Sequence, residues 1–160
     1  MENLLNKESV KRVKEFIKNF DSNLEVIVLN TTARTAKDAA NSLKCEVGAI
    51  VKSLLFKVED NFLICLIAGD KRCSLNKLKK ILKKKDVSMA SADEVKEKTG
   101  FSIGGVAPVA YITSLSILVD KSLSRFSYVF AAAGHPNCVF KISYEGLIKI
   151  TNGSEKEIIE

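Results

Sequence analysis

A lysine inside an apolar, strand-like run is the first group in this sequence that could take part in chemistry. Residues 50–58 have the composition of a β-strand, and because strand side chains alternate between faces, Lys52 shares a face with Leu54 and Phe56. An ammonium group on an apolar face needs a partner or a water-filled cleft. Lys52 is therefore a candidate site residue. The alternative is that it extends to water from an ordinary strand.

A glycine-rich segment is the second feature. Gly100, Gly104 and Gly105 are three of the eight glycines in the chain, and Pro108, one of only two prolines, ends the segment. Glycines let backbone N–H groups approach a ligand, and successive exposed amides can hold a phosphate or polarise a carbonyl. The segment lacks the Lys-Ser/Thr of a P-loop and the spacing of a dinucleotide fingerprint. A plain helix-to-strand connection is the alternative.

A run of small residues before the only histidine is the third feature. Residues 131–134 are three alanines and a glycine, which leave space beside a strand, and His135 follows them. Pro136 and Asn137 are ordinary turn formers, so the segment also reads as a simple hairpin. A dyad or half a metal site made of His135 and Cys138 is an alternative that a hairpin does not reliably assemble.

A strongly basic stretch adds a possible contact to a polyanion. Six lysines and no acidic residue surround an apolar stripe between residues 77 and 85. Such a field could hold a nucleic-acid backbone through Lys77, Lys80 and Lys84, which would set affinity and salt dependence rather than sequence choice. An ordinary solvated helix face is the alternative.

The elements that must position these residues alternate irregularly along the chain. We expect helices over residues 7–20, 35–43, 74–85, 91–100 and 143–150, with a short helical segment after Asp120. We expect strands over residues 24–29, 50–58, 62–68, 87–90, 109–112, 116–119, 128–133 and 138–142. The order lacks a strict βαβ alternation, which predicts an α+β fold with a mixed or largely antiparallel sheet.

Length and composition limit the classes of protein. The 160 residues, 46% hydrophobic and 28% charged, fit one globular domain, with a core over about 24–150 and a flexible tail over 151–160. The net charge of +6 makes a polyanionic partner plausible. No apolar run reaches the ~18 residues of a membrane span and no secretion signal is recognised, so we expect a cytoplasmic protein.

The four cysteines are scattered, and we expect them to be reduced thiols. No local pair of ligands starts a zinc site, so we expect neither a metal nor a cofactor.

The order of four segments resembles the YbaK/EbsC, or prolyl-tRNA-synthetase-associated, editing domain family. The segments are Thr35-Ala36-Lys37-Asp38-Ala39-Ala40, Ile50-Val51-Lys52-Ser53-Leu54, the loop of residues 99–108, and Ala132-Ala133-Gly134-His135-Pro136-Asn137. The similarity extends from about Thr31 to Ile150. It implies a curved, barrel-like sheet flanked by helices, and an enzyme that removes a wrong amino acid from tRNA by hydrolysing its ester.

The resemblance also implies roles for individual residues. Lys52 would engage the 3′-terminal nucleotide, and the amides of Gly104 and Gly105 would polarise the aminoacyl carbonyl. The strand that ends at Gly134 would wall the amino-acid pocket, with His135 a candidate for amino-acid selection. The remaining substrate contacts it implies are Thr31, Ser53, Ile103, Val106, Ala107, Pro108, Ala132 and Ala133.

The absence of a Ser-His-Asp pattern argues against a covalent serine hydrolase, so we expect catalysis by backbone amides and a bound water. The resemblance implies a small amino acid on tRNA(Pro) or a related tRNA, no DNA partner, and a possible association with a synthetase. The main alternative is a non-catalytic module that binds tRNA or a synthetase in the same cleft. An enzyme acting on free aminoacyl esters and a thiol enzyme using Cys138 are further alternatives.

Overall fold

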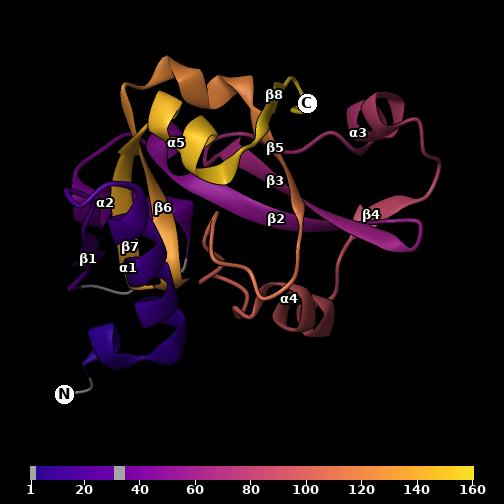
Figure 1. Ribbon diagram of the computed structural model, residues 1–160. Coiled ribbons are helices and arrows are strands. Elements are labelled where there is room, and N and C mark those ends of the chain that lie inside the picture. The colour runs from indigo at the N-terminus through magenta and orange to yellow at the C-terminus, as the bar shows by residue number, and fades with distance from the viewer. Residues whose placement is uncertain (1–2, 31–34) are drawn as a thin grey trace.

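The computed structural model describes residues 3–30 and 35–160 (Figure 1). Its α-helices are α1 (Glu8–Phe20), α2 (Ala36–Leu43), α3 (Leu75–Leu82), α4 (Ala92–Thr99) and α5 (Tyr144–Thr151). Its strands are β1 (Val26–Val28), β2 (Val51–Val58), β3 (Asn61–Ala68), β4 (Val87–Met89), β5 (Ser116–Asp120), β6 (Tyr128–His135), β7 (Cys138–Ser143) and β8 (Ser154–Lys156). Short 3-10 helices cover Leu4–Asn6, Val47–Ala49 and Lys121–Arg125.

The strands form two sheets. The smaller has the antiparallel order β1-β7-β6, and the larger has the mixed order β4-β2-β3-β5-β8, in which β5 runs parallel to both β3 and β8. An isolated bridge between Ile50, the residue before β2, and Phe130 of β6 joins the two sheets. The predicted α+β fold with a mixed sheet and flanking helices is confirmed, with the sheet divided in two at this bridge.

The main core lies between the two sheets. Alternate residues of β6 (Val129, Ala131, Ala133) face Val51, Leu55, Ile64 and Leu66 of the larger sheet, and α1 and α5 complete this cluster. A second cluster packs α3 against the opposite face of the larger sheet, and a third packs α2 against the opposite face of the smaller one. Figure 1 shows α2 beside the smaller sheet and α3 above the far end of the β2–β3 hairpin.

Local capping explains why several helices begin where the sequence predicts. The side chains of Thr35, Ser74 and Ser143 each accept a hydrogen bond from an amide of the following first turn. Ser91 and Glu94 form the expected capping box, and Gly100 ends α4 with a φ of 82°.

One predicted strand is absent. Residues 109–112 form no strand, because Ala110 adopts a φ of 65° and its carbonyl accepts a hydrogen bond from Arg12 instead of a neighbouring strand. Apolar composition alone predicted the strand, and the tertiary contact with α1 overrides it.

The end of the chain also differs from the expected flexible tail. Residues 154–156 pair with β5 as strand β8, and Ile158 is fully buried in the second cluster. The Ile158 amide donates to Asp120 Oδ1 at 2.8 Å, and the Ile158 carbonyl accepts from the Ser74 amide at 2.7 Å. Both partners are distant in sequence, so no local pattern in residues 151–160 indicates that they pack onto the sheet.

Candidate functional site

A cleft of about 330 Å³ lies where the two sheets meet. Its main walls are the start of β2, one face of β6 and β7, the first turn of α2, and the loop of residues 103–106. Met89, Ala90, Val95 and Pro136 complete the lining. Of the predicted site residues it brings together Lys52, Ser53, Ile103, Gly104, Val106 and Ala132.

The open edge of β2 explains why this cleft exists. β4 pairs with Phe56, Lys57 and Val58, so among the described strands the first half of β2 has no neighbour in its own sheet on that side. Successive residues from Ile50 to Leu55 therefore line the cleft although their side chains alternate between faces. A loop and a second sheet, rather than a further strand, cover this edge.

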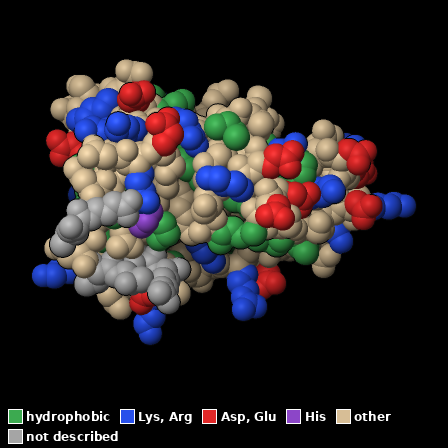
Figure 2. Space-filling view, turned by 90° about the horizontal axis from the view of Figure 1, so that it is seen from below, with side chains coloured by type: hydrophobic (Ala, Val, Ile, Leu, Met, Phe, Trp, Pro, Cys, Tyr) green, Lys and Arg blue, Asp and Glu red, His purple; other side chains and the backbone are tan. Residues whose placement is uncertain are grey.

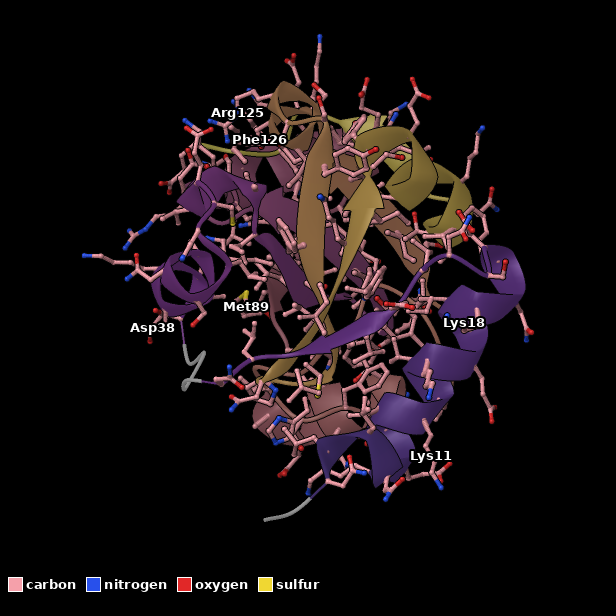
Figure 3. The ribbon with its side chains drawn as sticks, turned by 90° about the vertical axis from the view of Figure 1, so that its left-hand side faces the viewer. Lys11, Lys18, Asp38, Met89, Arg125 and Phe126 are labelled. Atoms are coloured by element: carbon pink, nitrogen blue, oxygen red, sulfur yellow. The ribbon has the colours of Figure 1, made fainter. Side chains whose placement is uncertain are left out.

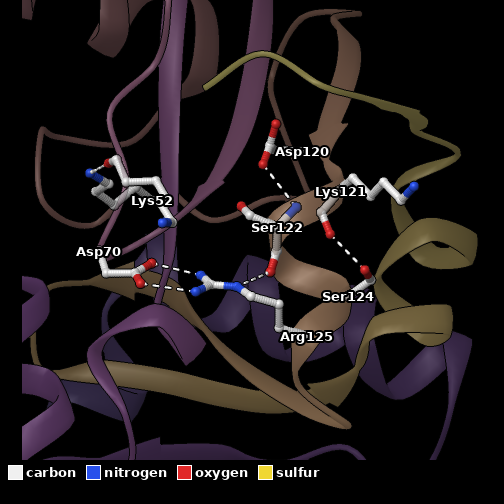
Figure 4. Close-up of polar contacts among 8 residues, drawn as sticks. Lys52, Asp70, Asp120, Lys121, Ser122, Ser124 and Arg125 are labelled. Carbon is white, nitrogen blue, oxygen red and sulfur yellow. Dashed lines mark hydrogen bonds and ion pairs between the residues drawn. The ribbon is translucent and has the colours of Figure 1, made fainter. Parts of the chain in front are cut away.

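Lys52 is half-buried at the cleft wall, on the face predicted from alternation. It lies opposite Ile67 of β3, on the side of the sheet that carries Leu54 and Phe56. Its ammonium donates a hydrogen bond to the carbonyl of Lys71, just beyond the end of β3 (Figure 4). Burial lowers the pKa of Lys52 below its ordinary value, and the nearby Asp70 carboxylate opposes this shift.

Asp70 in turn forms a two-pronged ion pair with Arg125. The two guanidinium nitrogens lie 2.7 and 3.0 Å from the carboxylate oxygens, and Arg125 Nε donates to the carbonyl of Ser122 at 2.7 Å (Figure 4). The hydrogen bonds from Arg125 hold the pKa of Asp70 below its ordinary value. Lys52 therefore lies next to a carboxylate that is already neutralised by another cation.

The loop of residues 99–108, here called the glycine loop, has one glycine amide that is already bonded and one for which the described residues offer no acceptor. The Gly105 amide donates to the Ser102 carbonyl at 3.0 Å, which closes a turn within the loop. Gly105 is buried and does not line the cleft, whereas Gly104 lines it with a φ of 92° and its amide has no acceptor among the described residues. Of the two glycine amides expected at a substrate carbonyl, that of Gly105 is bonded within the loop, and that of Gly104 has no acceptor in the described part of the chain.

Ser53 contributes a polar group to the cleft. Its hydroxyl oxygen is buried and has no hydrogen-bond partner in the described part of the chain. A buried hydroxyl without a partner is unfavourable, so a ligand or water in the cleft would satisfy it.

Alternation along β6 separates cleft residues from core residues. Phe130 and Ala132 face the cleft together with Val139 of β7, whereas Ala131 and Ala133 are fully buried in the core between the sheets. Ala132 therefore forms a small part of the cleft wall. Ala133 packs in the core and does not line the cleft.

Gly134 and His135 extend β6 beyond its predicted end at residue 133, and neither lines the cleft. The Nδ1 atom of His135 accepts a hydrogen bond from the Asn137 amide at 3.1 Å within the hairpin turn. His135 is visible as the purple residue on the face shown in Figure 2 and is partly exposed there. The geometry assigns it a turn contact rather than a place in the cleft wall.

The remaining predicted residues lie elsewhere. Ala107 is fully buried in the core, and Pro108 lines a separate surface depression next to α1. Lys77, Lys80 and Lys84 lie on or just after α3, with Lys77 Nζ bonded to the Ile159 carbonyl and Lys84 paired with Glu59. Thr31 lies outside the described residues.

Several cleft residues were not predicted as site residues. They are Thr35, Ala36, Ala39, Ile50, Val51, Leu54, Leu55, Met89, Ala90, Val95, Phe130, Pro136 and Val139. Phe130 could have been found, since it lies two positions before Ala132 on the same strand face. Met89 depends on how β4 ends beside β2, which no local pattern shows. Figure 3 shows Met89 near α2, and it is 55% exposed.

The described residues also bear on a metal site, a membrane span and a thiol enzyme. In residues 3–30 and 35–160 no cluster of three metal-binding side chains is found, and no helix there is long and apolar enough to cross a membrane. Cys138 is buried, and burial raises the pKa of its thiol, which disfavours the thiolate that a thiol enzyme needs.

Comparison with known proteins gives a consistent set of similarities. A family model described as an aminoacyl-tRNA editing domain matches residues 30–150. YwhH of Bacillus subtilis (strain 168) is 31% identical over 136 residues, which cover 84% of this chain and 86% of YwhH. The proline–tRNA ligase of Kosmotoga olearia is 38% identical over 96 residues, 58% of this chain but only 16% of the ligase.

Solved structures that resemble this chain point to the same group of proteins as the sequence relatives. A crystal structure described as "a putative trans-editing enzyme for prolyl tRNA synthetase" superposes with a TM-score of 0.91 at 34% identity, covering 96% of this chain and 98% of that one. The crystal structure of the hypothetical protein APE2540 gives a TM-score of 0.86 at 30% identity, covering 93% and 99% of the two chains.

Proposed function

Because the chain belongs to the aminoacyl-tRNA editing domain family, we propose that it is a trans-acting deacylase that hydrolyses the ester between a wrong amino acid and the 3′ end of a tRNA. One observation carries the proposal. The cleft at the meeting of the two sheets combines a lysine, a glycine amide without a described acceptor and a small-residue wall, contributed by three separate segments of the chain.

In the proposed mechanism the backbone supplies the main electrostatic stabilisation. The Gly104 amide donates to the aminoacyl carbonyl oxygen, whose negative charge grows as water attacks the carbon. One such donor is worth about 3 kcal/mol in the transition state. A water molecule attacks, and the neighbouring ribose hydroxyl takes part in the proton transfer to the departing ribose oxygen. No protein nucleophile is required.

Lys52 positions the nucleotide in this scheme. When substrate enters, its ammonium exchanges the Lys71 carbonyl for a phosphate or ribose oxygen of the terminal nucleotide. Charge attraction and a charge-assisted hydrogen bond favour this exchange. The Ser53 hydroxyl supplies a further polar contact.

The proposed amino acid is small. Ala132, Val139 and Phe130 line the cleft on the side of the smaller sheet, and the cleft volume of about 330 Å³ favours a small side chain beside the nucleotide. Alanine, serine, threonine and cysteine are the candidates. The similarity to prolyl-tRNA ligases and to a structure described as related to prolyl-tRNA synthetase supports tRNA(Pro) or a related tRNA as the carrier.

A deacylation screen tests the proposal. Purified protein is incubated with tRNA(Pro) carrying alanine, serine, threonine, cysteine or proline, and ester loss is compared with spontaneous hydrolysis. We expect faster loss for at least one small amino acid and none for proline. No acceleration for any mischarged tRNA would rule out the deacylase.

A second function is favoured by two contacts. The Lys52 ammonium is bonded to the Lys71 carbonyl and the Gly105 amide to the Ser102 carbonyl, so the cleft is not fully arranged for catalysis. A non-catalytic module that holds the tRNA acceptor end would need no such arrangement. Saturable binding of charged tRNA without faster ester loss would identify the module.

A further inference from the structure

Helix α1 lies outside the segment matched by the family model, yet it contacts two of the segments that form the candidate site. The helix covers Glu8–Phe20, whereas the match begins at residue 30. Its apolar face buries Val10, Val13 and Ile17 in the core between the sheets. Two polar side chains at the edge of that face, Ser9 and Arg12, bond to backbone carbonyls of the site segments.

Arg12 donates hydrogen bonds to the backbone near both ends of the glycine loop. Its Nε donates to the Ala110 carbonyl at 2.8 Å, and its Nη2 donates to the Thr99 carbonyl at 3.3 Å. The guanidinium carbon lies 4.5 Å from the centre of the Phe101 ring, which is fully buried. One side chain therefore contacts the last residue of α4, the buried Phe101 ring and Ala110, two residues beyond the loop of residues 99–108.

Residues with positive φ lie on both sides of the Arg12 guanidinium. Ala110 has a φ of 65°, an unfavourable value for a residue with a Cβ, and this turns its carbonyl toward the guanidinium. At Gly100 a Cβ would lie 2.7 Å from Arg12 Nη2, so the side chain fills the space that the glycine leaves. A strained residue and a glycine thus flank the guanidinium.

Ser9 makes the matching contact to the end of β6. Its hydroxyl donates to the Gly134 carbonyl at 2.9 Å, inside the irregular part of the β6–β7 pairing. A Cβ at Gly134 would lie 2.5 Å from the Ser9 carbonyl oxygen, so helix and strand are in direct backbone contact. Gly105 is equally close to the backbone of His135, because a Cβ added at Gly105 would lie 2.9 Å from the Cα of His135.

We propose that α1 is a positioning element for the editing reaction, in which Arg12 fixes the loop that presents the Gly104 amide and Ser9 fixes the strand end against which the loop packs. This inference rests on the proposed deacylase function. Arg12 and Ser9 touch no substrate atoms and act through the backbone that they hold.

Arg12 is expected to affect turnover more than substrate binding. An oxyanion donor works only when it is held at the developing charge, and a displacement of about 1 Å can reduce the rate about 100-fold. Lys52, Ser53 and the β6 wall are not bonded to Arg12, so ground-state contacts are largely retained. Arg12→Ala is therefore expected to lower kcat about 10- to 100-fold with KM within about twofold of wild type.

Three variants form the kinetic test. Arg12→Lys keeps a cation near Phe101 but cannot bond two carbonyls in the same plane, and its kcat is expected between wild type and Arg12→Ala. Lys11→Ala, an exposed residue of the same helix (Figure 3), is the control and should leave both constants unchanged. An unchanged kcat in Arg12→Lys together with a folded, fully active Arg12→Ala would overturn the proposal.

Amide hydrogen exchange gives a readout that does not need activity. Arg12→Ala should speed exchange at Gly105 and Ile112, whose amides donate to the Ser102 and Thr99 carbonyls, at least tenfold while leaving amides of β3 unchanged. Ser9→Ala should do the same at His135. Faster exchange spread equally over β3 would indicate general destabilisation and contradict a positioning role. If wild type deacylates no tRNA, the proposed function fails, and the exchange data still decide whether α1 holds the loop.

Discussion

At the scale of single residues, Lys52 is the clearest test of the site. Lys52→Ala should lower deacylation and weaken binding of the tRNA 3′ end about 10- to 100-fold, because a hydrogen bond to a charged group contributes about 1.5–3 kcal/mol. The rate is measured with mischarged tRNA and the affinity by titration with uncharged tRNA.

Lys57→Ala is the matched control for Lys52. Lys57 lies on the same strand but is exposed on the other face, where its Nζ lies 3.6 Å from Glu94. The Lys57→Ala variant should retain the wild-type deacylation rate and the wild-type affinity for tRNA. A Lys52→Ala protein with both properties unchanged would show that Lys52 has no role in the site.

The ion pair beside Lys52 predicts a pH-dependent contribution to stability. Arg125 holds the pKa of Asp70 below its ordinary value of 3.8, so the pair stabilises the folded state above that pH, and the contribution is lost as the pH falls through the lowered pKa. Both side chains are more than a third exposed (40% and 36%), so the contribution is below about 1 kcal/mol.

Asp70→Asn measures this contribution directly. The thermal midpoint of the variant should lie below that of wild type at pH 7, and the difference should shrink as the pH falls below 3.8. A difference that stays constant down to pH 2 would mean that the carboxylate charge does not stabilise the fold.

At the scale of secondary-structure elements, the end of the chain carries a prediction about stability. Ile158 is fully buried against α3 and β3, so Ile158→Ala should lower the free energy of unfolding by about 2–5 kcal/mol. Ile112→Ala, at a residue 57% exposed, should change it by less than about 0.5 kcal/mol. Denaturant unfolding compares the two, and equal effects would contradict the packing of residues 154–160.

Elements with local signals were predictable from the sequence, and elements that depend on distant contacts were not. The caps at Thr35, Ser74, Ser91 and Ser143 lie within three residues of the amides they bond, so the sequence shows them. The absence of a strand at Ala110 depends on Arg12, and β8 depends on β5.

The same division holds within the candidate site. Alternation placed Lys52 on the correct face of β2, and composition indicated the cleft wall at Ala132 and the glycine loop at Gly104. The acceptor of the Lys52 ammonium, the turn that uses the Gly105 amide and the position of Met89 at the cleft all depend on contacts between separate segments. No spacing within one segment indicates them.

At the scale of the whole molecule, the net charge of +6 predicts a salt-dependent association with tRNA. Replacing Lys77, Lys80 and Lys84 with alanine should reduce the slope of log affinity against log salt by about 0.7–0.9 for each lost phosphate contact. Lys11, Lys14 and Lys141, which are exposed on α1 and β7 rather than on or beside α3, form a control triple with the same change in charge. Equal effects of the two triples would show that α3 is not a specific tRNA contact.

The isolated bridge between Ile50 and Phe130 has a consequence for how binding can be detected. It is the one strand bridge found between the two sheets in the described residues, and beyond it the sheets diverge around the cleft. A molecule held there contacts both sheets and adds an attachment that the empty protein lacks. A ligand that binds only the folded state raises the stability of that state. A non-hydrolysable aminoacyl-adenosine should therefore raise the melting temperature of the protein. Calorimetry can then rank amino acids by binding, even in a variant that has no deacylase activity.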